Sequence, residues 1–266
     1  MTRDTIRTVR SARGTLRVEA AIPEWIEPAI ELALDAATRP FCIGEFVTFA
    51  GRRAYFKKRR VHGRARVECA WRMLAPFARM PREREFARLS WLAERLFQVP
   101  RPLAAGALAH RGLPRFQFLL CAEIAPAVTL DAFLRHGWDG ASGTNPWARV
   151  PGATACEPSA AQRERVIREL ARELARMHAL HFVHGAATLD HVLVGAESPA
   201  SRVHFLAPRP AHAIVRTRTS ARDLAPAAAA LAADERRLFV ATYVEERTAQ
   251  GRPIDARRLD EELGLH

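Results

Sequence analysis

Residues 177–194 read MHALHFVHGAATLDHVLV, and the organisation of the whole chain can be inferred from this segment. We predict that a helix ends at Met177 and His178, that His184 opens a short polar loop, and that residues 192–194 form a strand. The loop therefore joins a helix to a strand, and its polar residues are the first candidates for a functional site.

The loop has the outline of a catalytic loop that lacks its acid. In phosphotransferases of the protein-kinase type such a segment reads H-x-D-x-x-x-x-N, where the Asp orients the attacking hydroxyl and the Asn binds a metal ion. Counted from His184, the Asp position is Ala186 and the Asn position is His191. Asp190 is adjacent to His191, and we expect it to be a solvent-exposed turn residue.

The length and composition favour a globular protein. The chain has 266 residues, 48% of them apolar and 26% charged, which is enough for two lobes or two small domains. We find no apolar run of the ~18 to 20 residues needed to cross a bilayer, and the first residues lack the apolar core of a secretory signal. The expected location is therefore the cytoplasm.

The chain is strongly basic, with a net charge of +12 and a pI near 11. Such a charge favours nucleotides, phosphorylated glycolipids, an anionic membrane surface or nucleic acid as partners. An arginine-rich coding bias explains the charge equally well, because arginine is spread along the whole sequence. The four cysteines form no CxxC pair, so we expect them to be reduced and structural rather than metal ligands.

Lysine stands out against this arginine background. Of the 41 basic residues only Lys57 and Lys58 are lysines, and they follow the apolar residues of a predicted strand at 53–58. A compact ammonium suits a phosphate contact, as in the third strand of a kinase. The alternative is a basic run at an exposed strand end.

The remaining pattern predicts an antiparallel sheet followed by helices. A capping box, Ser159 with Gln162, opens a buried helix that leads to the polar loop. No G-x-G-x-x-G loop precedes the lysines, so a nucleotide would be held differently from the standard pattern. The predicted strands are 13–22, 41–49, 53–58, the pair beginning at 103 and 115–123; the predicted helices are 28–39, the segment around 85–96, 129–134, 159–178, 224–231, the segment beginning at 234 and 255–263.

The order of these motifs resembles the lipopolysaccharide core kinase (Kdo/WaaP, InaA-like) family over about residues 40–245. The motifs are FKK at 56–58, Glu85 with its helix, VPRPLAAG at 99–106, the loop segment, ARDLA at 221–225 and FVATY at 239–243. The resemblance implies an α+β, two-lobed protein-kinase-like fold, with a small antiparallel sheet plus one helix over a mainly helical C-lobe. We place the N-terminal lobe at 1–122 and the C-terminal lobe at 123–266, with a loop insertion at 137–158.

The resemblance also assigns candidate nucleotide-binding residues. Lys58 resembles the phosphate-binding lysine, with Lys57 as the alternate if the register slips by one. Glu85 resembles the helix glutamate that pairs with this lysine, and Glu83 is its alternate.

Further residues carry over from the family to the hinge and the catalytic loop. Backbone groups from Cys121 through Glu123 to Ile124 resemble the hinge that binds adenine. His184 and Asp223 resemble the residues that support the catalytic loop, and His191 falls at a metal-binding position. Asp223 can equally be read as an N-cap ahead of a helix at 224–231.

Two acids that the family uses are missing from this chain. A metal-binding Asp is expected in residues 204–209, HFLAPR, but Leu206 stands at that position, although Arg209 fits. Together with Ala186, this leaves no assignable catalytic acid. We therefore expect a pseudokinase that has lost ATP-dependent phosphotransfer to lipopolysaccharide core sugars, but that binds ATP or a phosphoglycolipid, and we do not expect Mg²⁺.

Other functions remain open. The first alternative is an active sugar kinase whose metal site is rebuilt on Asp190 and His191, so the sequence does not decide whether the chain is an enzyme. A zinc site on the histidines at 178, 181, 184 and 191 is a weaker reading. A nucleic-acid-binding protein is the last alternative, but no stacking platform is present and we do not expect this partner. We expect peripheral contact with the inner membrane surface, and the sequence gives no oligomeric state.

Overall fold

The computed structural model describes residues 6–39, 41–74, 79–124, 126–137, 157–185, 187–195, 202–206 and 216–264. The chain divides into two compact units, one of Met1–Leu96 with Pro100–Glu123, and one of Phe97–Val99 with Ile124–His266. The predicted boundary lay one residue earlier, and the short Phe97–Val99 segment was assigned to the other lobe.

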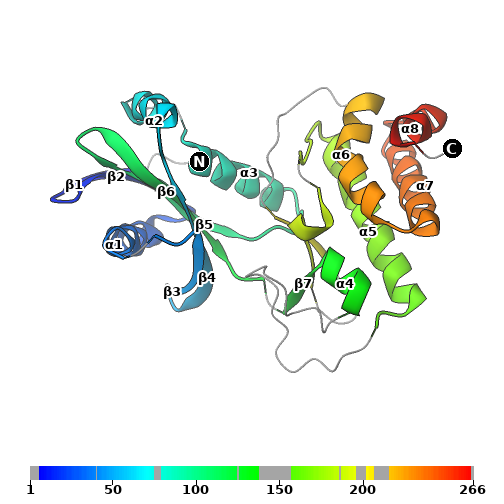
Figure 1. Ribbon diagram of the computed structural model, residues 1–266, viewed down its shortest axis with the longest axis horizontal. Helices are drawn as coiled ribbons and strands as arrows, with labels where there is room; N and C mark the ends of the chain where they lie inside the picture. The colour runs from blue at the N-terminus through cyan, green and yellow to red at the C-terminus, as the bar shows by residue number, and fades with distance from the viewer. Residues whose placement is uncertain are drawn as a thin grey trace. The chain divides into compact units, whose positions relative to one another are not determined.

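The first unit is built on a six-stranded antiparallel sheet with the order β1-β2-β5-β6-β4-β3 (Figure 1). Two mainly apolar strands, β5 and β6, pair in its middle, which agrees with the predicted strands there. The strands are β1 (Ile6–Ser11), β2 (Gly14–Ala20), β3 (Gly44–Phe49), β4 (Arg52–Arg60), β5 (Pro102–His110) and β6 (Leu113–Ala122).

A hairpin at Ala50 and Gly51 joins β3 to β4, between the predicted strands at 41–49 and 53–58. Phe49 pairs with Arg52, and the two residues between them have φ angles of 47° and 74°. Positive φ at both central positions is the geometry that matches the twist of the flanking strands in a two-residue hairpin. The hairpin fixes the register of β4, and therefore the directions in which its two lysines point.

The two faces of the sheet carry different helices. The face with Val18, Phe56 and Phe118 packs on the apolar side of α1, in one buried cluster. The opposite face is partly ionic, since Arg17 of β2 contacts Glu83 of α3 at 3.3 Å. The helices of this unit are η2 (Pro23–Trp25), α1 (Ile26–Ala36), α2 (Arg64–Leu74) and α3 (Pro81–Glu94).

The helices predicted at 28–39 and around 85–96 are present as α1 and α3, but β1 and α2 were not predicted. β1 has mostly exposed positions and reads IRTVRS, so no apolar run marks it. On α2, Val67 and Trp71 are exposed, so the apolar residues do not form the buried stripe by which a helix is recognised.

The second unit is mainly helical. The predicted capping box is present, because Ser159 Oγ accepts from the Gln162 N–H at 3.2 Å and Gln162 Oε1 accepts from the Ser159 N–H at 2.8 Å. α5 packs against α7, and α6 against α8. The elements are β7 (Ala127–Thr129), α4 (Leu130–His136), α5 (Ala160–Ala179), η4 (Leu189–His191), β8 (Val192–Gly195), β9 (Arg202–Phe205), α6 (Thr217–Ala230), α7 (Ala233–Ala249) and α8 (Ala256–Leu263).

A three-stranded antiparallel sheet, β7-β8-β9, lies in the same unit. The predicted insertion at 137–158 falls almost wholly outside the described residues, which include only Gly137 and residues 157 and 158 of it. Among the helices of the described ranges, none combines the length and the apolar character that crossing a bilayer requires.

Candidate functional site

The pleat of β4 sends Lys57 and Lys58 to opposite faces of the first unit's sheet. Lys57 faces α3, where its Nζ lies 3.0 Å from Oε1 of Glu85. Glu85 also pairs with Arg82. Burial alone would raise the pKa of the Glu85 carboxyl, but the charges of Lys57 and Arg82 hold the pKa below its ordinary value. Glu85 is therefore a carboxylate that positions the Lys57 ammonium.

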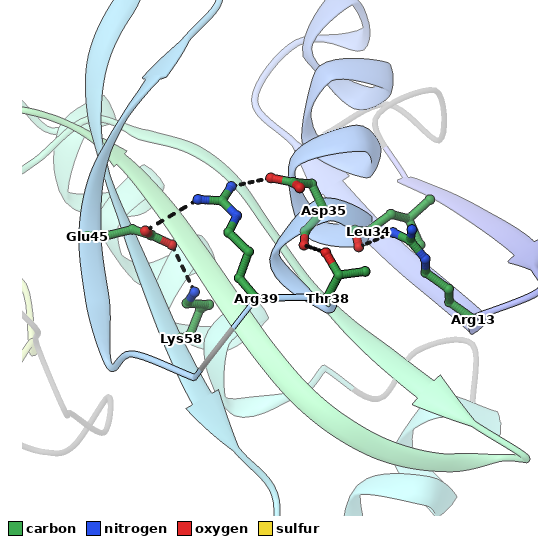
Figure 2. A network of polar contacts seen from close by, with 7 residues as sticks. All are labelled: Arg13, Leu34, Asp35, Thr38, Arg39, Glu45 and Lys58. Atoms are coloured by element: carbon green, nitrogen blue, oxygen red, sulfur yellow. Dashed lines mark hydrogen bonds and ion pairs between the residues drawn. The ribbon is translucent and has the colours of Figure 1, made fainter.

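Lys58 lies on the α1 side and is almost completely buried (Figure 2). Its Nζ donates to Oε1 of Glu45 at 2.8 Å and lies 5.4 Å from the centre of the Phe56 ring. Arg39 bridges Glu45, at 3.6 Å, to Asp35 at the end of α1. This network connects β3, β4 and the segment that follows α1.

The expected pairing of Lys58 with Glu85 is thus wrong, and the lysine next to Glu85 is the alternate, Lys57. The physical reason is the period of two along a strand, since a shift of one residue moves a side chain to the other face. A buried ammonium that is already paired with Glu45 is a structural group.

Glu83 does not pair with either lysine. It is fully buried, and its Oε2 accepts from the backbone N–H of Met80 at 2.8 Å, which caps the start of α3. Arg17 neutralises its other oxygen. Burial raises the pKa of this carboxyl despite these contacts.

The predicted hinge segment uses two of its backbone donors within the sheet. The N–H of Ala122 bonds to the carbonyl of Arg101 at 2.8 Å, and that of Glu123 to the carbonyl of Arg53 at 3.1 Å. The Glu123 side chain also contacts Arg53, at 3.2 Å. Cys121 is buried, and burial raises the pKa of its thiol. The side chains of Cys121 and Glu123 therefore pack on or pair with the sheet. The N–H groups of Ala122 and Glu123 are not free to bind a ligand.

Asp223 organises the polar loop of the second unit. Its Oδ2 accepts from the N–H of His184 at 2.8 Å, and its Oδ1 from that of Gly185 at 2.6 Å. Burial alone would raise the pKa of Asp223, but the hydrogen bond from His178 and the surrounding imidazoles hold it below its ordinary value. Asp223 lies in the middle of α6 rather than at an N-cap, because the helix begins at Thr217.

His178 extends this network to α7. Its Nε2 lies 3.0 Å from Oδ2 of Asp223, and its Nδ1 lies 2.6 Å from the hydroxyl of Tyr243. A carboxylate only accepts, so Nε2 carries the proton and, in the neutral ring, Nδ1 accepts from Tyr243. Burial raises the pKa of Tyr243 to about 12, which keeps it a donor. Tyr243, His178 and Asp223 form one chain of hydrogen bonds that ends on the loop backbone.

Roles for Tyr243 and Glu45 were not predicted, and His178 was considered only as a ligand in the zinc alternative. A histidine in the last turn of a buried helix, directly before the polar loop, was the available signal for His178. No sequence signal connects Tyr243 to the loop, because 65 positions separate it from His178.

His184 is completely buried and packs on Phe205, with ring centres 5.5 Å apart. Burial lowers the pKa of this imidazole to about 4, an effect that the nearby carboxylate of Asp223 only partly opposes. The ring is therefore neutral at physiological pH and braces the loop by packing.

Leu206 and His191 lie side by side where β8 begins and β9 ends. Val192 pairs with Phe205, and the N–H of Leu206 bonds to the carbonyl of His191 at 2.8 Å. The Leu206 side chain is buried in an apolar cluster with Ala127 and Leu193. This position is one residue beyond the strand and next to the loop, and it holds no oxygen ligand.

The described residues do not fit a magnesium ion. Mg²⁺ needs oxygen ligands in near-octahedral geometry. Nδ1 of His191 lies 2.8 Å from the hydroxyl of Thr188, Asp190 is exposed in η4, and no group of three or more potential metal-binding side chains occurs in the described part of the chain. The predictions for Ala186 and Arg209 concern positions outside the described residues.

Comparisons with known proteins agree on one family. The model of the lipopolysaccharide kinase (Kdo/WaaP) family matches residues 44–228. A solved structure described as WaaP in complex with acyl carrier protein is similar, with a TM-score of 0.57, 18% identity and 94% of each chain covered. No curated protein matches the sequence. The predicted α+β fold of protein-kinase type is confirmed by this structural similarity.

Replacing Asp223 by Asn should destabilise the second unit by about 3 kcal/mol, because one oxygen that accepts a backbone N–H is replaced by a donor. The measurement is urea unfolding followed by circular dichroism. Asp234→Asn, on the exposed start of α7, is the matched control and should change the free energy of unfolding by less than about 0.5 kcal/mol. Equal stability of both variants would contradict the role assigned to Asp223.

His184 should make the folded state less stable in mild acid. Its folded pKa of about 4 lies below the ordinary value, so between these pH values the unfolded chain binds a proton that the folded chain does not. Stability is therefore lost as the pH falls, by about 2 kcal/mol between about pH 7 and about pH 5.

The variant His184→Phe should lose this part of the pH dependence, measured as the difference in unfolding free energy between the two pH values. Asp223 does not contribute to the change in stability between these pH values, because a carboxyl with a lowered pKa takes up its proton only at lower pH. Buried carboxyls with raised pKa values, such as Glu19 and Glu173, make the folded state more stable as the pH falls. They are present in both proteins, so their effect cancels when the variant is compared with the wild type. An unchanged pH slope in the variant would refute the assignment.

Proposed function

Because the chain belongs to the lipopolysaccharide kinase (Kdo/WaaP) family, we propose that it is a pseudokinase of that family, which binds a nucleotide or a phosphoglycolipid without transferring phosphate. The observation that carries this proposal is that Leu206, which the motif resemblance matches to the family's metal-binding Asp, is buried among apolar side chains. An aliphatic side chain cannot bind a metal ion.

A second loss in the same unit supports the proposal. Ala186 stands at the position of the acid that would orient the attacking hydroxyl. General acid or base catalysis contributes roughly 10²- to 10⁴-fold to a rate, and the loss of a metal adds to this deficit. The supporting groups of the loop, His184 and Asp223, are kept, so the unit retains its shape without its catalytic acids.

The phosphate-binding half of the proposal rests on Lys57. Its ammonium is about a quarter exposed, whereas its partner Glu85 is mostly buried. Such a pair leaves donors of the ammonium directed to solvent while the carboxylate fixes its position. Lys57 is therefore the residue that we propose to contact the phosphates of ATP. Contact of the basic chain with the inner membrane surface belongs to the same proposal.

Thermal unfolding with ATP tests nucleotide binding. We expect ATP without magnesium to stabilise the protein, by about 2.7 kcal/mol at about 100 times its Kd, and added Mg²⁺ to give no further increase. Lys57→Met should abolish the shift, because Arg82 still neutralises Glu85 but no ammonium remains for the phosphates. Arg52→Gln, on the exposed end of the same strand, controls for nonspecific binding by a basic chain.

One result would contradict the pseudokinase, and another would contradict the role proposed for Lys57. Stabilisation that requires Mg²⁺ and is lost in Asp190→Asn, together with transfer of phosphate from ATP to lipopolysaccharide, would establish the active kinase with a rebuilt metal site. An ATP shift that survives in Lys57→Met would remove Lys57 from the binding site.

A protein partner is a further part of the proposal. The similar solved structure contains acyl carrier protein, and we propose that this chain also associates with a partner of that kind. Size-exclusion chromatography of the purified chain with acyl carrier protein should show one co-eluting peak at low salt. Separate elution of the two proteins at low salt would exclude this partner.

A further inference from the structure

A pocket of about 350 Å³ lies in the first unit, and its lining includes neither Lys57 nor Glu85. It is formed where the end of α1, the end of β4, the start of β6 and the start of α2 meet. The volume is at the lower end of the range for small-molecule sites.

The lining of this pocket is strongly basic. Four arginines contribute to it, and no acidic side chain does among the described residues. They are Arg39, Arg60, Arg66 and Arg115. Cations that share a concave wall repel one another, and an anion bound between them relieves that repulsion.

The backbone holds three of these arginines in place. Arg60 pairs in register with Phe116, and the N–H of Val61 bonds to the carbonyl of Arg115 at 3.2 Å, so Arg60 and Arg115 lie on neighbouring strand ends. Arg66 lies in the first turn of α2, where helix N–H groups also favour an anion.

The state of the guanidinium groups points to an external ligand. Arg39 is neutralised by Asp35 and Glu45 within the network of Figure 2. Arg60, Arg66 and Arg115, by contrast, have no carboxylate partner among the residues that the structure describes. The Nε of Arg66 is buried and has no hydrogen-bond partner in the same residues. A buried donor without a partner is destabilising, and a bound acceptor would satisfy it.

Aromatic side chains complete the walls. The guanidinium of Arg60 lies 4.6 Å from the centre of the Phe41 ring, and Phe116 is buried beside it. Stacking on a ring restricts the orientation of a guanidinium and leaves its edge available for a planar or tetrahedral acceptor.

We propose that this pocket is an anion-binding site for a phosphate monoester, held by Arg60, Arg66 and Arg115. Guanidinium groups bind phosphate oxygens in pairs, and three of them match the charge of a dianion better than that of a single carboxylate. The monoester belongs either to a free phosphorylated small molecule or to the headgroup of a lipid. The site is separate from Lys57, so it does not depend on the proposed function.

Isothermal titration of the full chain with inorganic phosphate, and sedimentation with vesicles, test the site. The vesicles contain phosphatidylcholine with or without phosphatidic acid. We expect saturable phosphate binding that weakens on the order of 10-fold or more in Arg66→Gln and further in the double variant Arg66→Gln with Arg115→Gln. Arg52→Gln, which removes the same charge from β4 outside the pocket, should bind like the wild type.

The two sources of the ligand are distinguished by the vesicles. Sedimentation with phosphatidic acid that is lost in the double variant assigns the site to a lipid headgroup, whereas saturable phosphate binding without such sedimentation assigns it to a free monoester. Equal phosphate binding by the double variant and Arg52→Gln would overturn the proposal, and so would the absence of saturable binding of either probe.

The same titrations separate this proposal from the pseudokinase. Lys57→Met should keep phosphate binding in the pocket and lose the effect of ATP, and the double variant should show the reverse pattern. Loss of both in Lys57→Met would show that phosphate binds at Lys57 and not in the pocket.

Discussion

The alternation of side chains along β4 is the constraint on which the first unit depends. Consecutive residues of a strand face opposite sides, so one lysine meets α3 and the next is enclosed on the side of α1. Glu85 receives the first, and Glu45 receives the second. Each carboxylate is held ionised by its lysine, and each pair joins the strand to a different neighbouring element. The unit thus uses the only two lysines of the chain for two different tasks, one partly open to solvent and one buried.

In the second unit a single carboxylate has a comparable structural role. Asp223 accepts from two successive backbone N–H groups of the loop and from a buried imidazole that is itself fixed by Tyr243. The network connects α5, α6, α7 and the polar loop through this one carboxylate. In the pseudokinase that we propose, the geometry of the loop is therefore kept without the chemistry of phosphotransfer.

Much of the fold could be predicted because apolar patterns mark buried elements. The long strands β5 and β6, the hairpin with its turn at Ala50 and the capped helix α5 all carry such patterns. β1 and α2 were missed because their side chains are largely exposed, so their sequences carry no periodic pattern of buried apolar residues. The site was predicted less well. The lysine register depends on the sheet and cannot be read from two adjacent identical residues, and the bonds of Asp223 join positions about 40 residues apart.

The exposed pattern of β1 has a consequence for the behaviour of the chain in solution. β1 is an edge strand of the six-stranded sheet, and its outer backbone groups are not paired within that sheet. An unpaired edge strand can pair with a strand of another molecule and so begin aggregation. Arg7 is paired with Glu27, but Arg10 places positive charge along this strand, so that a second copy approaching side by side would meet like charge. Part of the basic character of the chain therefore serves colloidal stability, independently of any ligand.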